Sequence, residues 1–237
     1  MIIDLPLVVL AGGYGTRIRP SIGDTAKILA PVNDKTLLHY QMENWISLGI
    51  RKFLFILHFK ADDVKREVAI FIENSINDIK VDFHTEVSAL GTGGGINEVV
   101  QKGKLTGEFL VINGDTWLSG GFDEISTQTA HSLLLKGVND VSRFGAVELD
   151  EMLSIKSFLE KTPGKPNPGL IYAGLCKLSH HLFNFEFDKL VSLENDLFPR
   201  MVHEKILKGV VYFGDFIDIG VPKDYQMYVD RKLSKEF

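Results

Sequence analysis

The sequence predicts an α/β fold, a three-layer, doubly wound arrangement around a mostly parallel, Rossmann-like sheet. Two observations lead to this prediction. Short runs of consecutive apolar residues, typical of strands buried on both faces, alternate with segments whose apolar residues recur at helical spacing. The first apolar run also ends in glycines, as strands that lead into a binding loop often do. Alternation of strand and helix is the pattern of a doubly wound sheet.

Strands and helices alternate throughout the first half of the chain. The strands are predicted at 7–11, 53–57, 81–85 and 109–112. The helices are predicted at 37–48, 62–74 and 93–100. The first helix stops before Gly49, and glycine is common just past the end of a helix.

The second half is less regular. Its strands are predicted at 132–136, 144–149, 153–160, 171–178 and 210–214. Its helices are predicted at 194–209 and 224–233. The proline-rich segment 162–168 indicates a loop. Because neither a repeat nor a low-complexity linker interrupts the chain, residues 1–237 are interpreted as one domain with two halves, at about 1–120 and about 121–237.

Size and composition narrow the class of protein. The chain has 237 residues, 45% of them apolar and 24% charged, which suits a globular protein with a sizeable core. A net charge of −5 without a long basic run argues against nucleic acid and membrane surfaces as partners. The single cysteine, Cys176, excludes an internal disulfide. With neither a signal peptide nor a membrane-spanning apolar run predicted, the expected location is the cytoplasm.

The loop at 12–15 follows the first predicted strand and contains three glycines. Glycines let the backbone approach a ligand closely, and consecutive N–H groups can line an anion site. The cations Arg17, Arg19 and Lys27 come soon after it, as a triphosphate would require. The pattern is neither a Walker A loop nor a dinucleotide fingerprint. A glycine turn flanked by solvated arginines is an equally good interpretation of these residues alone.

Two aspartates are embedded in apolar segments. Asp115 ends the strand run 111–115, and Asp218 lies within 216–220. A carboxylate in such surroundings is unfavourable unless it is paired or bound to a cation. Mg²⁺ takes one or two protein carboxylates and completes its shell with phosphate oxygens and water. The alternative is two separately capped turn aspartates, and the nearby Asp215 is interpreted as a turn residue.

The segment 10–20 resembles the signature of the sugar-1-phosphate nucleotidyltransferases. The segment 26–32 is similar to the lysine motif that follows in that family, with Ala26 where the family usually has proline. The resemblance extends from residue 7 to residue 225, and its blocks keep their order. This joint pattern is more specific than any single block.

The resemblance implies a nucleotide-binding first half and a sugar-phosphate-binding second half. Arg17 would stabilise the departing pyrophosphate, and Lys27 would contact the phosphates of both substrates. Asp115 and Asp218 would hold Mg²⁺. The implied nucleotide-binding residues are Leu10, Ala11, Gly12, Gly13, Gly15, Thr16, Glu86, Gly91, Thr92, Asn113 and Gly114.

Glu86 precedes a Leu-Gly-Thr turn that, in similar proteins, cups the base and ribose. A carboxylate only accepts hydrogen bonds at neutral pH, and guanine offers two adjacent donors on its Watson–Crick edge. The hypothesis is that Glu86 selects guanine. The alternative is a solvated surface glutamate, because most glutamates are exposed.

The segment 158–161 resembles the Phe-x-Glu-Lys motif of the family and implies that Lys161 binds the sugar phosphate. The implied sugar-binding residues are Gly145, Glu160, Tyr172, Ala173 and Gly174. Many members have asparagine at the position of Tyr172, although a phenol can also donate and accept hydrogen bonds.

The segments 143–148, 192–196 and 216–225 resemble one branch of the family, the D-glycero-α-D-manno-heptose 1-phosphate guanylyltransferases. The resemblance implies that the chain condenses this heptose phosphate with GTP, releasing pyrophosphate and a GDP-sugar for bacterial surface polysaccharides. The first alternative is the same reaction with UTP, dTTP or CTP and a hexose 1-phosphate. The second is a catalytically silent nucleotide sensor, which should have lost the arginine, lysine or aspartates. The expected partners are a nucleoside triphosphate and a sugar 1-phosphate, and a homodimer is allowed for.

Overall fold

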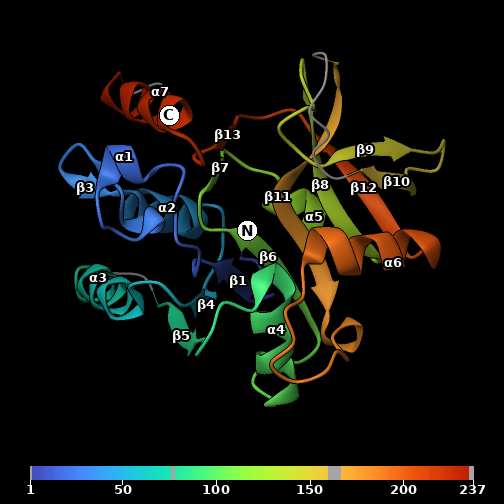
Figure 1. Cartoon of the computed structure of the whole chain (residues 1–237), viewed down its shortest axis with the longest axis horizontal. Coiled ribbons are helices and arrows are strands. Elements are labelled where there is room, and N and C mark those ends of the chain that lie inside the picture. Colours follow the sequence, from blue (N-terminus) through green and yellow to red (C-terminus); the bar gives the residue numbers. More distant parts are fainter. Residues whose placement is uncertain (1, 76–77, 160–166, 235–237) are drawn as a thin grey trace. The chain divides into compact units, whose positions relative to one another are not determined.

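The computed structural model covers the whole chain and describes residues 2–75, 78–159 and 167–234 (Figure 1). The chain divides into two compact units. Unit 1 comprises Met1–Ala89, Ile112–Gly120 and Asp215–Phe237. Unit 2 comprises Leu90–Val111 and Gly121–Gly214. Both units therefore draw on separate stretches of sequence, and the prediction of a single domain with halves at about 1–120 and 121–237 stays a prediction.

Unit 1 contains parallel strands built from the predicted apolar runs. They are β1 (Leu7–Leu10), β4 (Lys52–Leu57) and β5 (Lys80–Thr85). β4 pairs with β1 on one side and with β5 on the other, both in parallel. The side chains of β1 from Leu7 to Val9 are fully buried, as expected of a strand covered on both faces. The predicted strands at 7–11, 53–57 and 81–85 are confirmed.

Unit 1 has four α-helices among its described residues, and all but the first were predicted from the sequence. They are the short α1 (Arg19–Ile22), then α2 (Leu37–Ser47), α3 (Ala61–Glu73) and α7 (Pro222–Leu233). Thr36 caps α2 by accepting a hydrogen bond from the backbone N–H of His39. Gly49 follows α2 with φ of 98°, the left-handed conformation predicted for it.

A short two-stranded antiparallel sheet, formed by strands far apart in the chain, was missed by the sequence pattern. Its strands are β7 (Thr116–Leu118) and β13 (Phe216–Asp218), and Asp218 pairs with Thr116. The α2 amides hold β7 from the side: Gln41 donates to the carbonyl of Thr116 at 2.7 Å, and Asn44 to that of Leu118 at 2.8 Å. Two smaller strands, β2 (Pro31–Val32) and β3 (Lys35–Thr36), pair just before α2.

The β7–β13 sheet belongs to a buried cluster that joins the loop after β1 to α7. Its members are Ile18, Ile22, Ala30, Val32, Leu37, Trp117, Ile217, Ile219, Tyr225 and Tyr228. Burial of this many apolar side chains stabilises the β7–β13 sheet, which is too short to be stable by itself.

Lys232 of α7 inserts its ammonium among aromatic rings of this cluster. Its Nζ lies 3.9 Å from the ring centroid of Trp117, 5.0 Å from that of Tyr40 and 5.6 Å from that of Tyr228. Burial lowers the pKa of Lys232 to about 8. The attraction between Lys232 and these aromatic rings therefore weakens when the ammonium loses its proton near pH 8.

We expect the fluorescence of Trp117 to titrate with a midpoint near pH 8, because Lys232, whose pKa is lowered to about 8, then loses its charge. The measurement uses Trp45→Phe, which leaves Trp117 as the only tryptophan. The Lys232→Met variant in the same background should lack the transition. Since the unfolded chain keeps this proton up to the ordinary pKa of 10.5, the free energy of unfolding should rise above pH 8 relative to Lys232→Met. A transition that persists in Lys232→Met would assign the titration to another group.

Unit 2 is built on a mixed sheet around β8 (His131–Val138). β11 (Gly169–Ser179) pairs antiparallel with β8, and β12 (Leu207–Tyr212) pairs parallel with it. β9 (Ala146–Leu149) pairs antiparallel with β10 (Ile155–Leu159) and with β11. β6 (Glu108–Asn113) lies next to β11 and leads from unit 2 into unit 1. The helices of unit 2 are α4 (Gly91–Gln101), α5 (Phe122–Ser126) and α6 (Phe198–His203).

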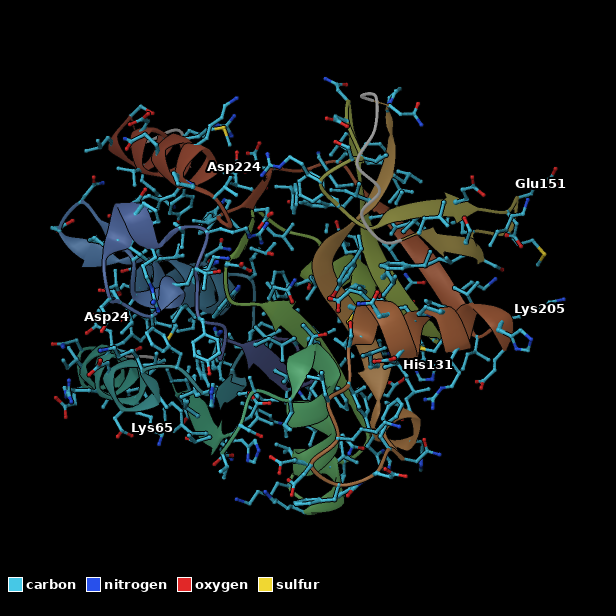
Figure 2. The ribbon with its side chains drawn as sticks, viewed as in Figure 1. Asp24, Lys65, His131, Glu151, Lys205 and Asp224 are labelled. Carbon is cyan, nitrogen blue, oxygen red and sulfur yellow. The ribbon has the colours of Figure 1, made fainter. Side chains whose placement is uncertain are left out.

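The predicted helix at 194–209 is wrong in its extent. A π-helical turn at Leu193–Leu197 leads into α6, which ends at His203. Lys205 lies just past the end of α6 (Figure 2). Its φ of 59° is a conformation that interrupts a helix. The chain then enters β12, where a Cβ on Gly209 would lie 2.6 Å from Leu135 Cδ1 of β8. Pairing with β8 therefore overrides the helical spacing of the apolar residues.

Candidate functional site

The glycine loop after β1 is held against the end of β4. The N–H of Ala11 donates to the carbonyl of Ile56 at 2.9 Å, and the N–H of Phe59 donates to the carbonyl of Gly12 at 3.3 Å. Gly15 has φ of 61°, and its carbonyl starts the turn into α1. A Cβ on Gly13 would meet nothing within 4 Å, so the backbone of Gly13 faces open space. The loop therefore offers backbone that a ligand can approach closely.

The two arginines of the loop differ in their surroundings. Arg19 lies 5.2 Å from the ring centroid of Phe59, donates to the Tyr14 carbonyl at 3.4 Å and pairs with Asp24 at 3.9 Å. Arg17 is exposed, and within the described residues it has neither a hydrogen bond nor an ion pair. Arg17 is therefore the cation of this loop that is available to an anionic ligand.

Lys27 contacts Asp115 directly. Its Nζ donates to Asp115 Oδ2, and the two side chains are 16% and 24% exposed. Lys27 begins a one-turn 3₁₀ helix, Lys27–Leu29, and follows Ala26, whose φ of −59° is close to the value that proline imposes. Alanine in place of the usual proline therefore leaves the backbone before Lys27 in the conformation that proline favours.

The two predicted metal-binding aspartates lie on hydrogen-bonded segments of unit 1. The N–H of Ile219 donates to the carbonyl of Asp115 at 2.9 Å, and Asp218 of β13 pairs with Thr116 of β7. On the other side, the N–H of Gly114 donates to the Leu10 carbonyl at 2.9 Å. These backbone hydrogen bonds bring the segments that carry Asp115 and Asp218 together with the start of the glycine loop.

These residues fit a hard divalent cation. Both aspartates are only partly buried, and carboxylate oxygens are the ligands such a cation prefers. Within the described ranges, no three or more histidine, cysteine, aspartate or glutamate side chains gather in a way that could hold a metal. A cation held by Asp115 and Asp218 would therefore complete its shell with phosphate oxygens and water.

Glu86 is a buried residue at the end of β5. It is 7% exposed, so the alternative of a solvated surface glutamate is wrong. Its N–H donates to the Leu57 carbonyl at 2.8 Å. A Cβ on Gly12 would lie 3.1 Å from Glu86 Oε2, which places this carboxylate against the glycine loop.

In unit 2, Gly91 and Thr92 begin α4 and pack against the segment after Lys189. Gly91 has φ of 80°, and a Cβ there would lie 2.6 Å from the carbonyl oxygen of Val191. The Thr92 hydroxyl donates to Glu194 Oε2 at 2.7 Å and accepts from the N–H of Leu193 at 2.8 Å. The Thr92 hydroxyl therefore positions Glu194, a residue to which the sequence assigned no role.

The predicted sugar-binding residues of unit 2 are brought together in part. The N–H of Tyr172 donates to the carbonyl of Gly145 at 3.1 Å. A Cβ on Gly145 would lie 2.7 Å from the ring of Phe158, so glycine is required for this packing. Ala173 and Gly174 continue β11, where Gly174 has φ of 78° at an irregularity of the pairing.

The side chain of Tyr172 points into the interior. Tyr172 is 8% exposed, and its ring meets that of Phe198 edge-on at 5.3 Å. Burial raises the pKa of Tyr172 well above its usual value, and it raises the pKa of the neighbouring Cys176 thiol to about 12. Glu194 is the acidic group near both. The predicted residues Glu160 and Lys161 lie outside the described residues.

The nucleotidyl transferase family model matches residues 7–234 of the chain. The chain belongs to the nucleotidyl transferase family. This nucleotidyl transferase is 33% identical to the D-glycero-alpha-D-manno-heptose 1-phosphate guanylyltransferase of Campylobacter jejuni, over 94% of this chain and 97% of the relative. It is 29% identical to the enzyme of the same name from Aneurinibacillus thermoaerophilus, over 97% and 96% of the two chains.

Solved structures agree with this assignment. HddC from Yersinia pseudotuberculosis has a TM-score of 0.81 and 32% identity, with 96% of this chain and 99% of HddC covered. A second structure of HddC is a complex with GMP-PN. A glucose-1-phosphate thymidylyltransferase from Bacillus anthracis shares the fold at a TM-score of 0.80 and 19% identity, with 95% of this chain and 94% of that chain covered. The predicted α/β fold, with its mostly parallel central sheet and flanking helices, is confirmed, as is the predicted nucleotidyl transfer.

Enzymes of this family generally use a divalent metal, which agrees with the two carboxylates of Asp115 and Asp218. Within the described part of the chain, no helix combines the length and apolar character needed to cross a membrane.

Proposed function

We propose that this nucleotidyl transferase condenses GTP with D-glycero-α-D-manno-heptose 1-phosphate to give the GDP-heptose and pyrophosphate. The observation that carries the proposal is the 33% identity to a heptose 1-phosphate guanylyltransferase along nearly all of both chains. The complex of HddC with GMP-PN, a guanine nucleotide, supports the choice of base. The buried carboxylate of Glu86 beside the glycine loop gives that choice a physical basis.

In the proposed reaction a nonbridging oxygen of the sugar phosphate attacks the α-phosphorus of GTP in line. The bond from the α-phosphorus to the oxygen that bridges to the β-phosphate breaks, and pyrophosphate leaves. Catalysis of this kind consists mainly of positioning and of offsetting negative charge. Arg17, exposed and unpaired among the described residues, stabilises the leaving pyrophosphate. Lys27, beside Asp115, orients the phosphates and reduces the repulsion between the substrates.

The divalent cation in this proposal is Mg²⁺, held by Asp115 and Asp218, and it would supply neutralisation of the phosphate charge. Lys161 and Glu160 are assigned by resemblance to the sugar phosphate and to the sugar hydroxyls. We also propose that the enzyme acts in the cytoplasm, supplies a precursor of surface polysaccharides such as capsule or lipopolysaccharide, and assembles as a homodimer.

The test is to identify the product by mass spectrometry after incubation with each of GTP, UTP, dTTP and CTP and a panel of sugar 1-phosphates. GDP-heptose should form fastest. Mannose 1-phosphate belongs in the panel because the chain is 28% identical to a mannose-1-phosphate guanylyltransferase subunit of Drosophila melanogaster, covering 60% of that protein. Faster turnover of UTP, dTTP or CTP with a hexose 1-phosphate would support the alternative reaction instead.

We expect Glu86→Gln to reduce the preference for GTP over inosine triphosphate (ITP) by about 10- to 100-fold in kcat/KM. ITP lacks the 2-amino group of guanine, which would donate a hydrogen bond to the Glu86 carboxylate. Pyrophosphate release with each nucleotide, at saturating sugar phosphate, measures this preference. Glu73→Gln makes the same change at an exposed position of α3 and should leave the preference unaltered. An unchanged preference in Glu86→Gln would remove Glu86 from the base site.

A further inference from the structure

His58 connects two segments of the nucleotide site in unit 1. It follows β4 directly, between the glycine loop and the end of β5. Its Nε2 lies 2.9 Å from the hydroxyl oxygen of Tyr14, in the glycine loop. Its Nδ1 lies 3.1 Å from the backbone carbonyl oxygen of Glu86. One imidazole ring therefore joins the loop to the residue expected to recognise the base.

The hydrogen-bond chemistry defines the state of this ring. A backbone carbonyl only accepts, so Nδ1 must carry the proton that is donated to Glu86. In the neutral ring Nε2 then has a lone pair, which accepts from the Tyr14 hydroxyl. Both ring nitrogens are used, and only one neutral tautomer satisfies both contacts.

The surrounding packing leaves little freedom at this junction. A Cβ on Gly12 would lie 3.1 Å from the backbone nitrogen of His58 and 3.1 Å from Glu86 Oε2. The ring of Tyr14 packs on Phe59 with centroids 5.6 Å apart. Glu86 is 7% exposed, so the surrounding atoms restrict the movement of its carboxylate.

We infer that His58 is a positioning residue that sets the base preference of the enzyme. By binding the carbonyl of Glu86 it fixes the backbone from which the carboxylate projects toward the base. By accepting from Tyr14 it holds the glycine loop against the same segment. His58 acts through Glu86 and Tyr14 and does not itself contact a substrate. The inference rests on the proposed preference for GTP and adds a residue that determines it.

The kinetic test separates the two hydrogen bonds of His58. His58→Ala loses both and should reduce the preference for GTP over ITP about tenfold, as expected for the loss of one well-placed hydrogen bond. His58→Asn places an amide N–H near the position of Nδ1 and should restore most of the preference. Tyr14→Phe removes only the loop contact. It should raise KM for both nucleotides about equally, and the preference should stay within about twofold of the wild-type value.

A matched control and a folding measurement accompany these variants. His181→Ala removes an exposed histidine of unit 2 and should change neither KM nor the preference. Thermal unfolding identifies any variant that fails to fold, and His58→Asn keeps the inference testable if His58→Ala does. A preference in folded His58→Ala equal to that of the wild type would overturn the inference and leave the proposed function standing. A wild-type enzyme with no preference for GTP would refute the proposed base recognition, and the inference with it.

An independent measurement needs neither substrate nor turnover. Long-range nitrogen–proton NMR correlations report which nitrogen of a neutral histidine carries the proton. For the neutral ring of His58 we expect the Nδ1–H tautomer, assigned by comparison with His58→Asn. In Tyr14→Phe the Nε2 resonance should shift, because its donor is gone, while Nδ1 stays protonated. An Nε2–H tautomer in the wild-type enzyme would overturn the inference whatever the kinetics show.

Discussion

Replacing Asp115 by asparagine is expected to lower kcat on the order of 10³-fold, the scale on which enzymes lose activity when a group that stabilises transition-state charge is removed. The substitution keeps the size of the side chain and removes the charge that pairs with Lys27. It also removes one of the two carboxylates proposed to bind Mg²⁺. Asp218→Asn should have an effect of similar size, because Asp218 pairs across the β7–β13 sheet with Thr116, the residue next to Asp115.

The measurement is pyrophosphate release as a function of Mg²⁺ concentration. Both variants should need more Mg²⁺ for half-maximal activity, which a general loss of structure would not produce. Asp215→Asn is the matched control: Asp215 precedes β13, is exposed and pairs with Arg231 at 3.8 Å. It should retain near-wild-type activity. Equal activity in Asp115→Asn and Asp215→Asn would show that Asp115 does not hold the metal.

Arg17→Gln is expected to reduce kcat by about 10²- to 10³-fold with a smaller change in KM. Arg17 is exposed and, in the described ranges, bonded to nothing, so its charge is free for the leaving pyrophosphate. The negative charge of the leaving pyrophosphate develops during the reaction. Loss of the Arg17 guanidinium therefore affects the transition state more than the bound substrate. Initial rates over a range of GTP concentrations separate the two parameters.

Arg19→Gln is the control, because the same change is made two residues away in the same segment. The guanidinium of Arg19 is already engaged by Phe59, Tyr14 and Asp24. We expect less than about a tenfold loss of kcat and a small decrease in thermal stability, as for other partly exposed contacts. If the two variants lost activity equally, the distinction between a free and an engaged arginine would have no catalytic meaning.

The sequence predicted the parts of the fold that local pattern determines. Continuous apolar runs gave the parallel strands β1, β4 and β5, because a strand buried on both faces needs apolar residues at every position. The short strands β7 and β13 escaped prediction since three residues are too few to show a period. Their pairing also depends on residues far apart in the chain. The helix predicted at 194–209 ran too far because Ile206, which lies between α6 and β12, continues the helical spacing of Leu197 and Met201.

The candidate site divides in the same way. The glycine loop, Lys27 and the two aspartates could be proposed as site residues because each lies in a local motif with its own chemistry. The burial of Glu86, the ring contacts of His58 and the bond from Thr92 to Glu194 could not, because they arise from residues far apart in the chain. His58 in particular carries no sequence signal, since a histidine after an apolar strand is ordinary by itself.

The pairing of β7 with β13 also bears on how the enzyme matures. Asp115 is synthesised long before Asp218, yet β7 has no antiparallel partner until β13 has left the ribosome. A nascent chain that has only reached the glycine loop, Lys27 and Asp115 therefore holds half of the proposed cation site. Domains form as units during translation, so competence for catalysis should appear late and abruptly rather than grow with chain length. Ribosome-arrested fragments ending before β13 should consequently be inert, however well β1, β4 and β5 have assembled.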